Sequence, residues 1–141
     1  MLEIEKQYVD QMVAHALEDN PDECCGILAG PHGKVVHLYR MTNTEHSPYR
    51  YNMDAKELFL TYREIEDKKW DLVAIYHSHT HSPAYPSTTD IRLATWPEAY
   101  YILVSLMDQY DLDEQPPPYL RGIRAFKISD GHVTEEEIKV R

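Results

Sequence analysis

The sequence predicts a single α/β domain over residues 1–141, with a mixed β-sheet and a helix packed on either side. Two apolar segments, 72–76 and 99–106, lack polar alternation, as central strands covered on both faces do. Two amphipathic segments, near the N-terminus and after residue 54, supply helices to cover those faces. The length of 141 residues is that of one ordinary domain.

The first quarter of the chain is expected to hold a helix and a β-hairpin. Residues 4–19 carry apolar side chains at spacings of three and four, and Asn20-Pro21 ends this helix. Residues 24–30 and 34–39 are predicted to be strands, joined by the Pro31-His32-Gly33 link.

A second helix is predicted to start after residue 54. Residues 42–50 are polar and form a loop, and residues 51–53 form a short strand. Asp54 is the expected N-cap, with Glu57 three residues later. The inner face of this helix is expected to consist of Leu58, Phe59, Tyr62 and Ile65.

The rest of the chain alternates strands with loops. A loop over 78–86 and a short helix over about 87–95 separate the two apolar strands. The acidic, proline-containing segment 107–119 is expected to be an exposed excursion. Residues 120–129 and 132–140 are predicted to form a second hairpin around Asp130-Gly131.

Charge and composition argue against several classes of function. Lysine and arginine total 14 against 24 aspartates and glutamates, a net charge of −10, which disfavours nucleic acid and anionic membranes as partners. No apolar run approaches the ~20 residues that span a bilayer. The N-terminus lacks the features of a signal peptide, so we expect a cytoplasmic protein. The adjacent Cys24 and Cys25 point to opposite faces of a strand, which excludes a disulfide framework.

The segment with the clearest chemistry begins at the end of the first apolar strand. His77 and His79 are two residues apart, so they face the same way, roughly 6.6 Å apart along a strand. Both imidazoles can reach one zinc ion, and Asp90 in the next helix is the natural third ligand. Three protein ligands leave a fourth position for water, which is the pattern of a catalytic zinc site.

Each of these features also has a purely structural interpretation. A His-x-His pair at a strand end is more often exposed or hydrogen-bonded than metal-bound. Ser87 and Asp90 have the spacing of a helix capping box. The two interpretations are compatible, since such a cap would hold both residues beside the histidines.

Taken together, these residues resemble the JAMM (MPN-type) zinc metallopeptidases. The match includes His77-x-His79, a serine ten positions after His77 and an aspartate at thirteen. Upstream, Glu23 precedes Cys24-Cys25-Gly26, as the essential glutamate of the family precedes its first strand. The segments Tyr51-x-Met53-Asp54 and Ile91-Arg92-Leu93-Ala94 resemble bacterial members.

The resemblance implies the α/β/α layers of the JAMM domain, which are similar to those of cytidine deaminases. It implies one Zn²⁺ per chain, bound by His77, His79 and Asp90 with water in the open position. Glu23 would be the general base, and Ser87 would donate a hydrogen bond to the developing oxyanion.

Thr80 and His81 depart from the family pattern. Many family members have proline directly after the second histidine, whereas this chain has Thr80, which alters the stiffness of the loop. His81 is an additional histidine. In one interpretation, His81 is an alternate ligand or a substrate contact. In the other, it is a solvated loop histidine, which Pro83 favours because a proline there indicates that the strand has ended.

The family cleaves amide bonds that follow the C-terminal tail of ubiquitin or ubiquitin-like proteins. This compact chain resembles the small bacterial branch, whose substrates are ubiquitin-like sulfur-carrier proteins that end in di-glycine and serve cysteine, thiamine or molybdopterin synthesis. Segments 42–53 and 107–119 are candidate substrate-facing regions. Two alternatives remain: a catalytically silent MPN-type interaction domain, and a zinc deaminase, which would need His-x-Glu and a later Pro-Cys-x-x-Cys.

Overall fold

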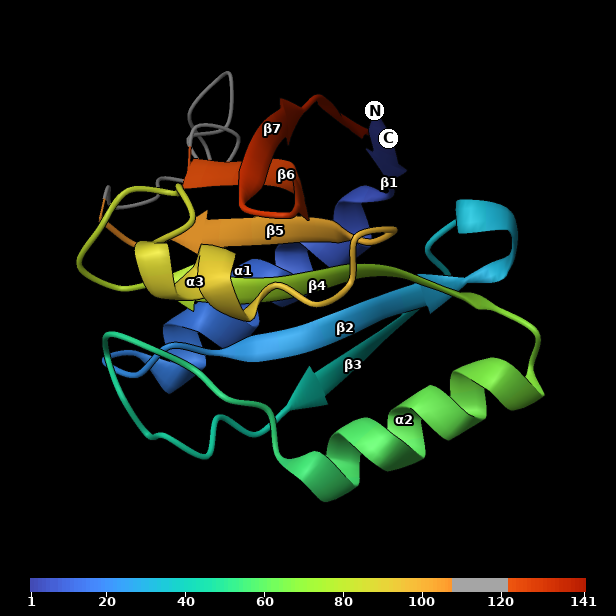
Figure 1. The fold of residues 1–141 in the computed structure, drawn as a ribbon, viewed down its shortest axis with the longest axis horizontal. Coiled ribbons are helices and arrows are strands. Elements are labelled where there is room, and N and C mark those ends of the chain that lie inside the picture. The colour runs from blue at the N-terminus through green and yellow to red at the C-terminus, as the bar shows by residue number, and fades with distance from the viewer. Residues whose placement is uncertain (108–121) are drawn as a thin grey trace.

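A computed structural model describes residues 1–107 and 122–141 of the chain (Figure 1). The described strands form a six-stranded sheet in the order β3-β2-β4-β5-β6-β7 and a two-stranded sheet, β1-β8. The strands are β1 (Leu2–Ile4), β2 (Cys25–Gly30), β3 (His37–Met41), β4 (Asp71–His79), β5 (Tyr100–Ser105), β6 (Ile123–Ser129), β7 (His132–Glu136) and β8 (Ile138–Val140). The helices are α1 (Lys6–Asp19), α2 (Ala55–Asp67) and α3 (Thr88–Leu93), with a 3-10 turn, η1, at Pro31–Gly33. The excursion predicted over 107–119 lies, after Met107, outside the described residues.

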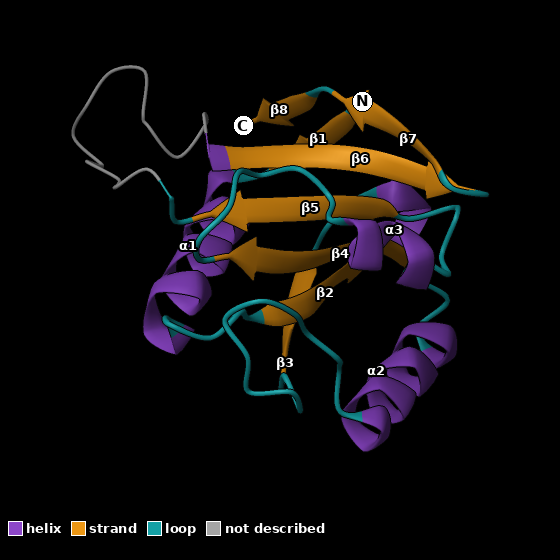
Figure 2. Ribbon diagram, turned by 60° about the vertical axis from the view of Figure 1, so that its left-hand side comes forward, coloured by secondary structure: helices purple, strands orange, loops and turns teal. Residues whose placement is uncertain are grey.

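Helices cover both faces of the larger sheet, which confirms the predicted α/β/α layers. Helix α1 lies behind the sheet, while α2 and α3 lie on the opposite side (Figures 1 and 2). Two apolar clusters follow this division, because alternate strand residues face opposite ways. Cys24 belongs to the cluster on the α1 side and Cys25 to the other, and both are buried free thiols.

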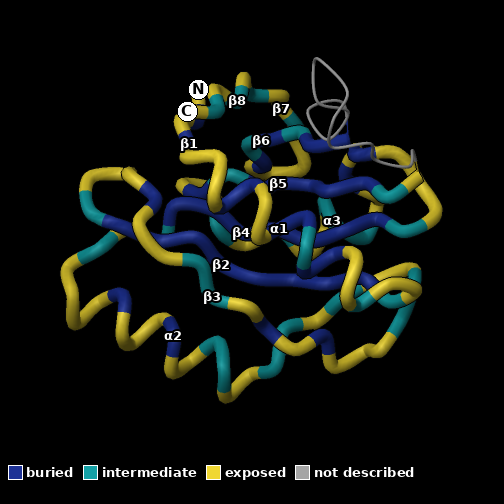
Figure 3. The backbone as a smooth tube through the Cα atoms, turned by 180° about the vertical axis from the view of Figure 1, so that it is seen from behind, coloured by how far each residue is buried: buried dark blue, intermediate teal, exposed yellow. Residues whose placement is uncertain are grey.

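Strand β4 is the central element for function. It pairs antiparallel with β2 and parallel with β5, so the sheet is mixed, as predicted. Residues 73–79 are buried without interruption, and the buried residues gather along the middle of the sheet (Figure 3). The strand extends three residues beyond its predicted end at Tyr76 and therefore includes both His77 and His79.

The two chain ends differ from the prediction. Helix α1 begins at Lys6, and Ile4 lies in β1. The second strand of the C-terminal hairpin ends with β7 at Glu136, and after Glu137 the chain continues as β8, which pairs with β1 in parallel. This pairing joins residues from opposite ends of the sequence, which local periodicity cannot reveal.

Two further predicted strands differ from the structure: one starts later than predicted and the other is a loop. The strand expected over 34–39 is β3, which starts at His37, because η1 and an extended connection precede it. His32 and Gly33 in this turn have positive φ angles of 53° and 72°. The expected strand 51–53 is a loop with one antiparallel bridge between Asn43 and Met53.

Helix α2 has the predicted cap but a narrower buried face. Asp54 accepts a hydrogen bond from the Glu57 backbone N–H, as predicted for an N-cap. Phe59 is 63% exposed and Tyr62 is 37% exposed, so their placement on the inner face was wrong. The buried residues are Thr61 and Ile65, because the helix rests on the sheet along a thin stripe.

The short third helix is close to its predicted position. It starts after Ser87, as predicted, and ends at Leu93 instead of Thr95. Within the described parts of the chain, no helix combines the length and the apolar character that a membrane crossing requires.

Candidate active site

Two elements bring the predicted site residues together at the C-terminal end of β4. His77 and His79 lie on the same face of this strand and are 1% and 4% exposed. After the loop over 80–86, α3 begins beside that strand end with Ser87 as its N-cap. Asp90 occupies the first turn of α3, and its carboxylate faces both imidazoles.

Three atoms of these residues form a nearly equilateral triangle. The Nε2 atoms of His77 and His79 are 3.2 Å apart. The Oδ2 atom of Asp90 lies 3.2 Å from the first and 3.1 Å from the second. Tetrahedral zinc ligands at about 2.0–2.1 Å from the ion lie roughly 3.3 Å from one another. The triangle therefore has the dimensions of one face of a zinc coordination shell.

The donor atoms of the site are of the types that bind a divalent cation. Nδ1–H of His79 donates to the Pro83 carbonyl at 2.8 Å, so Nε2 is the ring nitrogen that faces the other two atoms. Burial lowers the pKa of His77, so that ring tends to be neutral. Burial alone would raise the pKa of Asp90, but hydrogen bonds with His77 and His79 outweigh it and hold the carboxyl ionised. Burial alone would lower the pKa of His79, but hydrogen bonds with Asp90 and Pro83 outweigh it and raise that pKa. Once His79 has lost its second ring proton, the two imidazoles and the carboxylate are donors that zinc accepts.

Glu23 lies just before β2 and points toward the same site. One atom of its carboxylate lies within 4.8 Å of a ring nitrogen of both His77 and His79. The side chain is 3% exposed, and Oε1 has no hydrogen-bond partner among the described residues. Burial raises its pKa to about 8, against the opposing influence of His79. A buried carboxyl with a raised pKa is a typical proton-transfer group.

Backbone contacts fix the position of Glu23. Its N–H donates to the Ser47 carbonyl at 2.8 Å, and its own carbonyl accepts from the Asn43 side-chain amide at 3.0 Å. The loop over 42–53 therefore holds Glu23 at the site.

Ser87 and Asp90 form the capping box that the spacing predicts. The Asp90 N–H donates to Ser87 Oγ at 3.0 Å, and the Ser87 N–H donates to Asp90 Oδ2 at 2.8 Å. Because Ser87 Oγ acts as an acceptor in this box, its own proton can be donated to another group. The cap and the site use the same carboxylate oxygen.

His81 and Thr80 lie at the rim of the site. His81 is exposed, its ring is 5.7 Å from that of Tyr49, and Nδ1 is 2.8 Å from Thr80 Oγ1. It is not part of the triangle. Thr80 Oγ1–H donates to the Pro48 carbonyl at 3.0 Å and so links the two loops beside the site, a bond that proline could not make.

Two residues at the site were not assigned a role from the sequence. Tyr51 stacks on His77 with ring centroids 4.4 Å apart and an interplanar angle of 28°. Asn43 is 6% exposed and makes four side-chain hydrogen bonds inside the 42–53 loop and to Glu23. The only sequence signal was the Tyr51-x-Met53-Asp54 resemblance, and no pattern distinguished Asn43 from other loop residues.

The cysteines beside Glu23 are not candidates for a nucleophile. Burial raises the pKa of the Cys24 thiol to about 12 and lifts that of Cys25 further. Buried thiols of this kind are unreactive.

Comparison with known proteins identifies the family. The family model for prokaryotic homologues of the JAB domain matches residues 5–116. The CysO-cysteine peptidase of Mycobacterium tuberculosis (strain H37Rv) is 45% identical over 142 residues, covering 99% of this chain and 91% of that protein. A probable TtuB-protein conjugate cleaving protease of Thermus thermophilus is 30% identical over 132 residues, covering 93% of this chain and 78% of that protein.

A solved structure gives the same result for the fold. The solution structure of protein DSY2949 from Desulfitobacterium hafniense has a TM-score of 0.82 and 31% identity, covering 100% of this chain and 93% of that one. The chain belongs to the family of prokaryotic homologues of the JAB domain, the JAMM proteins, and is a hydrolase like its named relatives.

Proposed function

We propose that this chain is a zinc-dependent peptidase or isopeptidase that hydrolyses the amide bond after the C-terminal di-glycine of a ubiquitin-like or sulfur-carrier protein. The observation that carries this proposal is the triangle of His77, His79 and Asp90, whose edges measure 3.1–3.2 Å. These three residues would hold one Zn²⁺ per chain. When bound, zinc supplies a Lewis acid that lowers the pKa of water and polarises a carbonyl.

Glu23 is the general base in this proposal. In its ionised form, the buried carboxylate takes a proton from the attacking water and returns it to the departing amine, which would otherwise be a very poor leaving group. The unpartnered Oε1 is the atom free to hold that proton. The contacts with Ser47 and Asn43 hold the backbone of Glu23 in place beside the histidines.

Ser87 stabilises the developing negative charge. Its Oγ is held by the Asp90 N–H, and its hydroxyl proton is available to donate to the carbonyl oxygen as that oxygen becomes anionic. The capping box thus fixes a donor beside the reacting bond before substrate arrives.

The substrate class is supported by the relatives. One relative is named as a CysO-cysteine peptidase and another as a probable protease that cleaves TtuB-protein conjugates. A di-glycine tail can lie extended and enter a narrow site that larger side chains would block. The excess of acidic residues makes nucleic acid and membrane poor partners. We further predict that residues 1–141 form one domain and that the protein is located in the cytoplasm.

The test is incubation of the purified protein with a panel of di-glycine carriers, each extended by a C-terminal cysteine or a fused peptide. Intact mass should show cleavage directly after the second glycine, lost on chelation and restored by zinc. Carriers in which the terminal glycine is replaced by valine should remain intact. A protein that binds zinc but cleaves no carrier is the result expected of a catalytically silent MPN-type interaction domain. Chelator-resistant cleavage would exclude the zinc mechanism.

A further inference from the structure

The two histidines at the site are held in different ways. Nδ1–H of His79 donates to the Pro83 carbonyl, which fixes both the tautomer and the direction of that ring. Nδ1 of His77 is buried and has no hydrogen-bond partner within residues 1–107 and 122–141. A histidine ligand is ordinarily oriented by a hydrogen bond from its second ring nitrogen. Some other contact must therefore orient His77.

The ring of Tyr51 supplies this contact. It lies face to face with the His77 imidazole, with centroids 4.4 Å apart and an interplanar angle of 28°. Rotation of the imidazole out of its present plane would drive its edge into the Tyr51 ring. Such a rotation is also the movement that would take Nε2 away from His79 and Asp90.

Tyr51 is itself held on both sides. The Asn43 side-chain amide donates to the Arg50 carbonyl at 3.0 Å and accepts from the Asn52 N–H at 3.1 Å. These two residues flank Tyr51 in the chain. The same amide donates to the carbonyl of Glu23, so one buried asparagine fixes the general base and the stacking ring together.

We propose that Tyr51 is the positioning residue of His77, and that its ring keeps Nε2 directed at the metal position. Tyr51 orients the ring of His77 by stacking, as the Pro83 carbonyl orients the ring of His79 by a hydrogen bond. The inference rests on the proposed function in that His77 is taken to bind the ion.

The experiment compares two identical substitutions in one loop. Tyr51→Leu removes the stacking ring, whereas Tyr49→Leu removes a ring that is 74% exposed and faces His81. Zinc affinity is measured by competition with a chromogenic chelator, and ligand geometry by the visible spectrum of the Co²⁺-loaded protein. We expect Tyr51→Leu to weaken zinc binding roughly 10–100-fold and to alter the Co²⁺ spectrum, with Tyr49→Leu within about twofold of the unaltered protein. Tyr51→Phe retains the ring and should retain the affinity.

Each failure has a distinct meaning. Unchanged zinc affinity in Tyr51→Leu overturns the inference and leaves the proposed function standing. Equal losses in Tyr51→Phe and Tyr51→Leu would assign the effect to the hydroxyl and overturn the stacking role. An unaltered protein that binds no zinc overturns the proposed function as well. If circular dichroism shows that Tyr51→Leu does not fold, Tyr51→Met fills the space without a ring and should show the same loss.

Discussion

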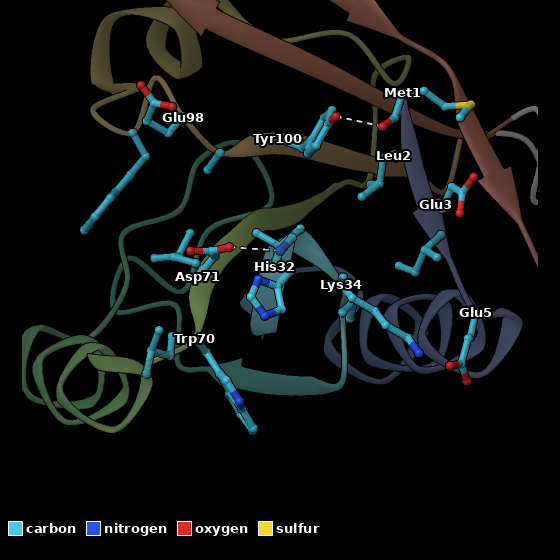
Figure 4. Close-up of a pocket in the computed structure, with 18 of the residues that line it drawn as sticks. Met1, Leu2, Glu3, Glu5, His32, Lys34, Trp70, Asp71, Glu98 and Tyr100 are labelled. Atoms are coloured by element: carbon cyan, nitrogen blue, oxygen red, sulfur yellow. Dashed lines mark hydrogen bonds between the residues drawn. The ribbon is translucent and has the colours of Figure 1, made fainter. Parts of the chain in front are cut away.

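The two ends of β4 differ in the volume of the nearby cavities and in the chemistry of the side chains around them. Next to Asp71, where the strand begins, a cavity of about 1090 Å³ opens between the chain termini and the start of β5 (Figure 4). Near the other end, a cavity of about 420 Å³ is lined by Glu23 and Asn43, and one of about 150 Å³ lies beside Tyr51 and Asp90. The proposed site is at the end with the smaller cavities.

The polar groups at the two ends differ in whether they have hydrogen-bond partners. In the large cavity, Asp71 accepts from the Gly33 N–H and the Tyr100 hydroxyl donates to the Met1 carbonyl, bonds that tie neighbouring segments together. At the other end, Glu23 and His77 are buried with atoms that lack partners among the described residues. The Glu23 carboxylate lies near the buried rings of His77 and His79, and desolvated polar groups gathered in this way are costly to keep without a ligand or a reaction to serve. Such buried polar groups indicate the position of the site better than cavity volume does.

Removal of a proposed ligand should have the largest effect. We expect Asp90→Ala to lose zinc and all measurable cleavage, because one corner of the triangle disappears. His81→Ala, which alters an exposed histidine outside the triangle, should keep full zinc occupancy by metal analysis. Zinc retained at full stoichiometry in Asp90→Ala would remove Asp90 from the ligand set.

Loss of the proposed base should be the next largest effect. Glu23→Gln keeps the size of the side chain but cannot accept the proton, so the cleavage rate should fall by about 10²–10⁴-fold. Zinc content should be unchanged, because Glu23 lies outside the triangle. Mass-resolved turnover and metal analysis on the same sample check both parts. A variant with normal turnover would show that another group moves the proton.

Ser87→Ala should have a smaller but still large effect. Loss of the oxyanion donor should slow cleavage by about 10²–10³-fold. Loss of the cap should lower the free energy of unfolding by about 0.5–2 kcal/mol. Ser87→Thr retains a hydroxyl for both roles and serves as the matched control, with rates and thermal unfolding as the measurements. Equal turnover in the alanine and threonine variants would contradict the oxyanion role.

The large cavity should give the smallest effect. Tyr100→Phe removes the hydrogen bond to Met1 and should cost about 0.5–1.5 kcal/mol of unfolding free energy at most. Cleavage rate and zinc affinity should not change. A clear change in turnover would contradict the contrast between the two ends of β4 and would show that the large cavity contributes to the reaction.

Patterns local in sequence predicted the central fold and the grouping of His77, His79 and Asp90, whereas only the resemblance to the JAMM family added Glu23 to the site. Uninterrupted apolar runs identified β4 and β5, and the Asp54 and Ser87 caps placed the starts of α2 and α3. The spacing of His77, His79 and Asp90 was enough to bring them together once the strand and helix were correct.

Contacts between distant segments could not be predicted in this way. Ile4 continues the apolar spacing of α1 but pairs with Val140, near the other end of the chain. Phe59 fits the apolar stripe of α2, yet it lies in solvent because the helix meets the sheet along a narrow contact. Tyr51 stacks on His77 and Asn43 donates a hydrogen bond to the Glu23 carbonyl, and the composition of the loop does not indicate either contact.

The double use of one oxygen in Asp90 links local order to ligand binding. With six residues, α3 is too short to persist as an isolated helix, so its first turn depends on the capping box. Because Oδ2 of Asp90 serves both that turn and the histidines, an ion that binds this oxygen also restrains the backbone of residues 87–90. Chelation should therefore loosen α3 first, and amide hydrogen exchange there should accelerate while the middle of the sheet stays protected.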